Sequence, residues 1–264
     1  EHYERSLAIM RKEHGRDDSL DVADTLNSIG VAHRCQGDYN RALEYCQRSL
    51  EIIKVHGGNC FQEHAAALYN IGRVYHSQGD FSNAVEHYKR SLEISGDVPG
   101  NDLDVADTLN YMGACYDSLG DFPRSLEHYE RSLKISCNVH GHMHPDVALA
   151  LYNIGTAYHC QGDYTLALKH YERSLAIKRK VYGSDEHPEV KNTLNKMGTA
   201  LRAQEGRGCQ GHVCKPPPSP APQSDVIQQM DPFVADELCN LGAAYSSLGD
   251  STRALEHYEG SLTI

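Results

Sequence analysis

The sequence of 264 residues contains no tryptophan and only four phenylalanines, whereas tyrosine occurs sixteen times. No stretch approaches the roughly 18 consecutive apolar residues of a transmembrane helix, so we expect no membrane association. Lysine and arginine are spread along the chain and the formal net charge is −11, so nucleic acid is not an expected partner. A hydrophobic content of 40% is enough for a linear core, provided that neighbouring units stack on one another.

Motifs of catalysis are also missing. The sequence has neither the phosphate loop GxxxxGK(S/T), nor the nucleophile elbow GxSxG, nor the zinc motif HExxH. We therefore expect no enzymatic activity, no small-molecule substrate and no cofactor.

Cysteine is present but follows no regular framework. The nine cysteines are odd in number and scattered, so we expect reduced thiols in the cytoplasm rather than disulfides. Two groups of possible metal ligands lie in expected loops. Cys209, His212 and Cys214 offer three ligands, whereas a closed zinc site needs four. His140, His142 and His144 occupy alternate positions, and alternation alone does not fix the geometry of a metal site. We expect solvated loops and no metal site at Cys209, His212 and Cys214 or at His140, His142 and His144.

Six glycines recur along the chain at intervals of 42, 41, 42, 43 and 44 residues. Each glycine follows an aliphatic residue or methionine and belongs to an apolar pattern with i, i+3, i+4, i+7 spacing. This spacing is typical of one face of a helix, which we call helix A. Because glycine inside a helix costs about 1 kcal/mol relative to alanine, its recurrence indicates that a neighbouring backbone approaches too closely for a side chain. The glycines are Gly30, Gly72, Gly113, Gly155, Gly198 and Gly242.

A second helix, called helix B, follows across a Gly-Asp turn. Glycine tolerates positive φ and aspartate caps the next helix, so the pair ends helix A and starts helix B. Helix B carries a small residue, an aromatic residue and a serine, and small residues allow the helices to approach to roughly 8–10 Å. The turns begin at Gly37, Gly79, Gly120, Gly162 and Gly249. The helix B patterns are Ala84-Tyr88-Ser91, Ser125-Tyr129-Ser132, Ala167-Tyr171-Ser174 and Ala254-Tyr258-Ser261, and the first unit departs only in having Cys46 between Ala42 and Ser49.

These patterns resemble the tetratricopeptide repeat, which has leucine, glycine and tyrosine on helix A and alanine, an aromatic and a small residue on helix B. The long unit of about 42 residues is most similar to the repeats of kinesin light chains. The resemblance implies an all-α fold, a right-handed superhelical solenoid of antiparallel helix pairs.

The unit boundaries divide the chain into four parts. Residues 1–14 match the tail of a truncated unit, 21–205 hold four full units and one helix A, and 233–264 match a truncated final unit, so we expect a fragment. Between them, 206–232 lacks the helix B pattern and carries the proline-rich run 216–222, which predicts an irregular, mobile loop. An inserted or erroneous sequence, a regulatory linker and a proline-rich docking peptide all remain open explanations.

In tetratricopeptide arrays, helix A positions that do not contact helix B line a concave groove, and the resemblance maps this groove onto the chain. Amides and tyrosines at one register suit the capture of an extended backbone, because an amide both donates and accepts hydrogen bonds. Alternatively, Asn70, Asn153 and Asn240 bridge adjacent helices. The groove residues are Asn27, Arg34, Tyr69, Asn70, Arg73, His76, Asn110, Tyr152, Asn153, His159 and Asn195, with Tyr111, Lys196 and Arg202 beside them.

Charge in this groove is mixed, since its arginines and histidines are opposed by Asp24, Asp107 and Asp117. Histidines that precede the helix B tyrosines, namely His87, His128 and His170, are expected on the outer surface. The sequence therefore predicts a protein–protein interaction scaffold that binds a peptide or partner protein in the groove. Two alternatives agree with the same resemblance, a cargo-adaptor segment of a microtubule motor and the sensor or scaffold arm of a larger signalling protein.

Overall fold

The computed structural model of the protein describes residues 19–56, 60–96, 100 and 102–209, and these residues form nine α-helices and no strand. The truncated units predicted at 1–14 and 233–264 lie outside the described residues. The helices are α2 (Leu20–Cys35), α3 (Tyr39–His56), α4 (Phe61–Gln78), α5 (Phe81–Ser95), α6 (Asp102–Ser118), α7 (Phe122–His140), α8 (Pro145–Gln161), α9 (Tyr164–Tyr182) and α10 (Pro188–Cys209).

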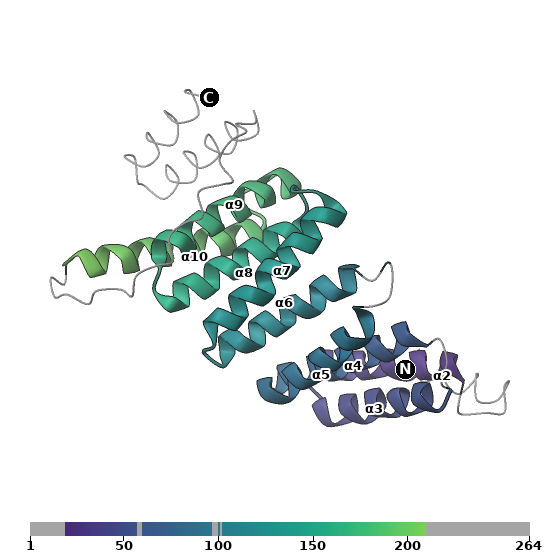
Figure 1. Ribbon diagram of the computed structural model, residues 1–264. Coiled ribbons are helices and arrows are strands. Elements are labelled where there is room, and N and C mark those ends of the chain that lie inside the picture. The colour runs from purple at the N-terminus through teal and green to yellow at the C-terminus, as the bar shows by residue number, and fades with distance from the viewer. Residues whose placement is uncertain (1–18, 57–59, 97–99, 101, 210–264) are drawn as a thin grey trace. The chain divides into compact units, whose positions relative to one another are not determined.

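The chain divides into two compact units, Glu1–Gly141 and His142–Ile264. In the first unit, α2 packs on α3, α4 on α5 and α6 on α7, and successive hairpins meet through α3 and α4 and through α5 and α6 (Figure 1). In the second unit, α9 packs against both α8 and α10. The predicted all-α array of helix pairs is thereby confirmed, while the handedness of its superhelix stays a prediction. None of the described helices combines the length and apolar character that crossing a bilayer requires.

The apolar pattern of helix A forms the core of each unit. Its leucine and the residue before its glycine lie on one helical face, because positions three and four apart are neighbours on a helix. These side chains are buried, and helix B of the preceding hairpin is among the elements that cover them, as Met112 packs with Tyr88 of α5 and Met197 with Tyr171 of α9. They are Leu26, Ile29, Leu68, Ile71, Leu109 and Met112 in the first unit and Leu151, Ile154 and Met197 in the second.

The helix A glycine leaves room for the aromatic ring of helix B. A Cβ atom on Gly113 would lie 2.6 Å from Cε1 of Tyr129, closer than real Cβ contacts allow. The pattern had predicted a neighbouring backbone, whereas the nearest atoms here belong to a side chain. In the first hairpin, a Cβ atom on Gly30 would lie 2.4 Å from Sγ of Cys46 and 3.0 Å from the backbone oxygen of Ala42. The same pairing joins Gly72 to Tyr88 and Gly155 to Tyr171.

The Gly-Asp turns have the predicted conformation. Their glycines have φ between 76° and 82°, a left-handed region that glycine enters without steric penalty. The aspartate then accepts a hydrogen bond from the backbone N–H three residues later, as Asp80 does from Asn83 at 3.1 Å. Pro145 and Pro188 begin α8 and α10, where the missing N–H of proline removes no helical hydrogen bond.

The serine of helix B has a bonding role that its small size alone did not indicate. In three hairpins its hydroxyl donates to a backbone carbonyl in the first turns of helix A, 26 residues earlier. In the first hairpin, Ser49 Oγ is buried and has no hydrogen-bond partner among the described residues. The bonds are Ser91 to Ala65 (2.9 Å), Ser132 to Ala106 (2.8 Å) and Ser174 to Ala148 (2.6 Å).

The last described helix extends beyond the boundary drawn from the sequence. We expected helix A of the fifth unit to end at residue 205, whereas α10 continues to Cys209, inside the segment expected to be irregular. The chain has no proline between Pro188 and Pro216, and the glycines at 206 and 208 are tolerated inside a helix. Residues 210–232 lie outside the described residues.

Candidate partner-binding site

The predicted groove residues lie on helix A of each hairpin, and each unit holds its own set. In the first unit they come from α2, α4 and α6, which lie side by side, and in the second unit from α8 and α10. Most of these side chains are half-buried, while Asn195 and Arg202 on α10 are exposed. The two sets are Asn27, Arg34, Tyr69, Asn70, Arg73, His76, Asn110 and Tyr111, and Tyr152, Asn153, His159, Asn195, Lys196 and Arg202.

Two of the predicted asparagines bond to each other. Nδ2 of Asn70 on α4 donates to Oδ1 of Asn27 on α2 at 3.2 Å. The alternative that asparagine bridges adjacent helices therefore holds for Asn70. Because a primary amide carries two donor hydrogens and two acceptor lone pairs, each of these side chains keeps hydrogen-bonding capacity beyond this bridge.

An aromatic cluster fills the first unit between α4, α5 and α6. The rings of Tyr69 and Tyr111 lie 5.8 Å apart edge to face, and Tyr88 lies 5.9 Å and 6.0 Å from them. The guanidinium of Arg73 lies 5.6 Å from the ring of Tyr69 and 5.3 Å from that of Tyr111, within the range of cation–π attraction. Burial raises the pKa of Tyr69 and Tyr88 well above its ordinary value, so both phenols stay neutral.

Arg34 reaches from α2 to the C-terminal end of α4. Its Nη1 donates to Oγ of Ser77 at 3.4 Å, and that hydroxyl in turn donates to the backbone oxygen of Arg73 at 2.9 Å. His76 lies on the same turn of α4, with its ring against Phe81 at 5.5 Å and Tyr111 at 5.9 Å. Burial first, and then the positive charges of Arg34 and Arg73, lower the pKa of His76.

The opposite end of this surface is acidic. A pocket of about 80 Å³ lies between the first turns of α4 and α6, with Tyr69, Asp104 and Asp107 in its lining and Ser91 and Ser95 of α5 behind them. Nearby, burial raises the pKa of Asp24 on α2, and the charges of Glu63 and Asp21 raise it further. The candidate site of the first unit therefore has a basic half at the C-terminal ends of α2 and α4 and an acidic half at the N-terminal ends of its A helices.

In the second unit, Tyr152 is engaged by a residue of helix B. Nζ of Lys178 on α9 lies 4.6 Å from the ring centroid of Tyr152 and 2.9 Å from Oε2 of Glu189 on α10. Lys178 also donates to Oγ1 of Thr193 at 3.1 Å, so the buried ammonium group has a full set of partners. Burial raises the pKa of Tyr152. His159 packs its ring 5.3 Å from Tyr164.

The helix B histidines do not lie freely on the outer surface. The ring of His128 stacks on Tyr116 at 5.3 Å and that of His170 on Tyr158 at 5.6 Å, and both are half-buried. Burial, with nearby Arg173 and Lys169, lowers the pKa of His170 to about 4. The expectation of surface positions is therefore wrong for His128 and His170, because the aromatic residue at the end of helix A covers them.

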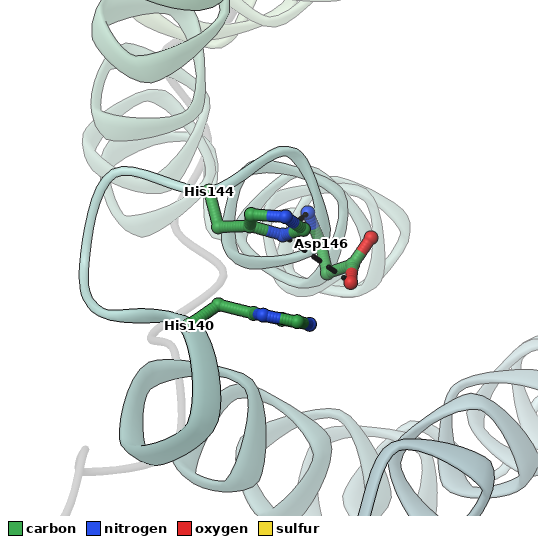
Figure 2. Close-up of side chains that lie close together, drawn as sticks. All are labelled: His140, His144 and Asp146. Atoms are coloured by element: carbon green, nitrogen blue, oxygen red, sulfur yellow. Dashed lines mark hydrogen bonds and ion pairs between the residues drawn. The ribbon is translucent and has the colours of Figure 1, made fainter.

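One histidine of the alternating loop caps a helix. His144 precedes α8, and its Nδ1 accepts from the backbone N–H of Asp146 at 3.3 Å and lies 3.3 Å from its carboxylate (Figure 2). His144 of this loop therefore has a capping role. His140 ends α7 of the first unit, and His212 and Cys214 of the other possible metal group lie outside the described residues.

Three residues of the site were not found from the sequence. Ser77 accepts a hydrogen bond from Arg34, Tyr88 packs against the rings of Tyr69 and Tyr111, and Lys178 lies against Tyr152. Tyr88 and Lys178 belong to helix B, and a search restricted to helix A positions passes over them. The signal that could have found Lys178 is a lysine two turns from the buried Tyr171 on the same helix.

Comparison with known proteins identifies the repeat. Tetratricopeptide repeat models match residues 1–54, 21–97, 63–138, 104–180 and 146–207, and another matches 238–264. No curated protein sequence matches the chain. Among solved structures, BtubC (BKLC) from P. vanneervenii has 19% identity and a TM-score of 0.60, covering 99% of this chain and 85% of its own.

A putative kinesin light chain of Podosopora anserina, with nearly identical TPR-like repeats, has 17% identity and a TM-score of 0.62, covering 72% of this chain and 90% of its own. The apo form of RapI has 14% identity and a TM-score of 0.61, covering 99% and 88%. At these identities the likeness shows the fold alone. Because the repeat models match well over half of the sequence, the chain belongs to the tetratricopeptide repeat family.

Proposed function

We propose that this protein is an interaction scaffold that binds a peptide or partner protein along its helix A surfaces and performs no chemistry itself. The observation that carries the proposal is the half-exposed cluster of Tyr69, Tyr111 and Arg73 on neighbouring A helices. Aromatic and arginine side chains account for most of the binding energy of protein interfaces, where they form well-packed, desolvated contacts. Asn27 and Asn70 beside them supply amide groups for a peptide backbone.

Selected peptides test this proposal. Peptides that bind the chain are selected from a random displayed library, and their affinity is measured by fluorescence anisotropy. Arg73→Ala in the first unit and Asn195→Ala in the second are expected to weaken peptides bound at their own unit by at least about fivefold, or about 1 kcal/mol. Lys89→Ala, an exposed change on helix α5, is the control. A loss of affinity in the control equal to that in the groove variants would contradict the proposal.

A second candidate function is a cargo adaptor of a microtubule motor. It is favoured by the name of one solved relative, a putative kinesin light chain with TPR-like repeats. Coelution of the chain with a kinesin heavy chain in size-exclusion chromatography would support this candidate. Separate elution of the two would contradict it and leave the peptide-binding proposal intact.

The compartment is also part of the proposal. Cys46 and Cys115 are buried thiols without disulfide bonds, and burial raises the pKa of each thiol to about 12. Thiols with such a pKa stay protonated and are inert near neutral pH. Cys35, in contrast, is exposed and forms no disulfide bond, which supports a reducing compartment such as the cytoplasm. Secretion of the folded chain into an oxidising compartment with full activity in peptide binding would contradict it.

A further inference from the structure

The basic half of the first unit concentrates positive charge in a chain whose formal net charge is −11. Arg73 and His76 both lie against the ring of Tyr111, and the charges of Arg34 and Arg73 both lower the pKa of His76, so the three side chains lie around one place on α4. Arg34 comes from α2, and its guanidinium bonds to Ser77, one turn beyond Arg73. This arrangement is fixed by the fold, because one arginine is held by a hydrogen bond and the other by two aromatic rings.

Neither arginine is neutralised. Among the residues that the structure describes, no carboxylate forms an ion pair with Arg34 or Arg73. The Nε atom of each arginine is also buried and has no hydrogen-bond partner there. Two other arginines of the same unit, Arg41 and Arg124, each pair with an aspartate. Arg124, for example, lies against the ring of Tyr116 and also pairs with Asp121 at 3.4 Å. Buried donors normally have acceptors, so two that lack them in one place indicate a missing acceptor.

A buried phenol beside them also lacks a partner. Tyr88 is fully buried and its hydroxyl has no hydrogen bond, whereas its counterparts donate, Tyr129 to Asp117 at 3.1 Å and Tyr171 to Thr156 at 3.2 Å. Asp117 stands four residues after the helix A glycine of its hairpin, and Thr156 stands one residue after that of its own. In the second hairpin, these two positions are occupied by His76 and Arg73. This hairpin thus has cationic or donor groups where the others have acceptors.

We propose that Arg34, Arg73 and His76 bind the phosphate group of a phosphorylated side chain in a partner peptide. This inference rests on the proposed peptide-binding function and names the chemistry of its ligand. Two uncompensated guanidinium groups match the charge of a phosphomonoester, about −1.5 to −2 at neutral pH, better than the single charge of a carboxylate. A phosphate also has three acceptor oxygens, which suit the planar forks of two arginines and one imidazole N–H.

The acidic half of the site defines the sequence around the phosphate. Asp104 and Asp107 lie near Tyr69, on the side away from His76, and they would repel an anion placed there. A residue of the bound peptide that extends over this pocket is therefore expected to be basic or neutral. The site discriminates against a continuous acidic segment, because such a segment would place carboxylates against Asp104 and Asp107.

The experiment compares three fluorescein-labelled mixtures of degenerate nine-residue peptides, whose fixed central residue is phosphoserine, serine or glutamate. Anisotropy is expected to show at least about tenfold tighter binding of the phosphoserine mixture than of either other mixture. Arg73→Gln and Arg34→Gln are each expected to reduce this preference to within about twofold. Arg124→Gln is the matched control, since it also removes an arginine that lies over a tyrosine ring, and it is expected to leave the preference unchanged.

Several results would overturn the inference. Equal binding of the three mixtures would refute phosphate recognition while the peptide-binding proposal stands, whereas binding of none would count against both. Equal binding of the glutamate and phosphoserine mixtures would assign a carboxylate to the site instead. If Arg73→Gln lowers the thermal midpoint, its loss of preference for phosphoserine reports on folding rather than on phosphate binding. The preference is then measured in Arg34→Gln and Arg73→Lys instead. Arg73→Lys keeps the charge but loses the planar fork, so it is expected to retain only part of the preference, and full retention counts against the proposed geometry.

Discussion

Replacing Gly113 by alanine sets two effects of opposite sign against each other on α6. Alanine has the higher helix propensity, which by itself stabilises a helix by about 1 kcal/mol. The new Cβ atom, however, would lie 2.6 Å, 2.7 Å and 2.9 Å from three ring carbons of Tyr129. Tyr129 is buried and its hydroxyl is held by Asp117, so the ring cannot move aside without losing that hydrogen bond.

The steric effect is expected to win. Overpacking of a well-packed core costs about 1–3 kcal/mol, which leaves a net destabilisation of up to about 2 kcal/mol after the gain in propensity. For a chain of this size, each 1 kcal/mol lowers Tm by roughly 2–4 °C. Gly113→Leu adds three further carbon atoms in the same place and is expected to be more destabilising than Gly113→Ala.

Urea unfolding followed by circular dichroism measures the change. Ala114→Gly, at the adjacent position of α6, is the control that reports the local helix propensity alone. A second control is Gly113→Ala combined with Tyr129→Leu, in which the smaller side chain on helix B is expected to recover part of the loss caused by the new methyl group. A rise in stability on Gly113→Ala, by the amount that Ala114→Gly loses, would show that the ring does not fill this space.

Three further changes test the hydrogen bonds and charges of the fold. Ser174→Ala removes a hydrogen bond and is expected to lower the free energy of unfolding by about 1 kcal/mol, whereas Ser49→Ala removes an unpartnered hydroxyl and is expected to be neutral or stabilising in the same urea assay. Glu189→Gln, which leaves the buried ammonium of Lys178 without its carboxylate, is expected to lower Tm more than Lys178→Met, which removes the buried charge. The pKa of His170 is about 4 in the folded chain and about 6.5 in the unfolded chain. As pH falls from about 6.5 to about 4, only the unfolded chain gains the proton, so stability is lost, by at most about 3 kcal/mol. His170→Phe is expected to flatten this part of a plot of Tm against pH.

Each of these predictions has a contrary result. Equal losses in the two serine variants would mean that the bond to the carbonyl contributes nothing beyond packing. A larger effect of the methionine variant than of the glutamine variant would mean that the lysine is not held as a buried ion. An unchanged acid profile in His170→Phe would assign the loss of stability below pH 6.5 to other groups, of which His128, with a pKa that is also lowered chiefly by burial, is the first to test.

Periodicity in the sequence determined the helix pairs of this protein, and the resemblance to the tetratricopeptide repeat implied how they form an array. Because the same local sequence pattern recurs about every 42 residues, the helices, the Gly-Asp turns and the apolar pattern of helix A could be predicted from one unit and checked against the next. The turns at Gly79 and Asp80, for example, depend only on φ and on a hydrogen bond to the backbone three residues away, both of which are local. The same logic failed where periodicity stops, since α10 continues to Cys209 through residues 206–209, which have no counterpart in the other units.

Side-chain partners were decided by the tertiary structure. The sequence placed Arg34, Arg73 and His76 on helix A, but it could not show that Arg34 crosses to α4 or that Arg73 lies between two tyrosine rings. It also could not show that neither arginine pairs with a carboxylate in the part of the chain that the structure describes. Nor could it show that Lys178 of helix B lies against Tyr152. Helical spacing fixes the direction in which a side chain leaves the axis of its own helix. The atoms that the side chain contacts belong to helices about 40 residues away. The distance and rotation of those helices depend on the packing of all the residues between the two helices.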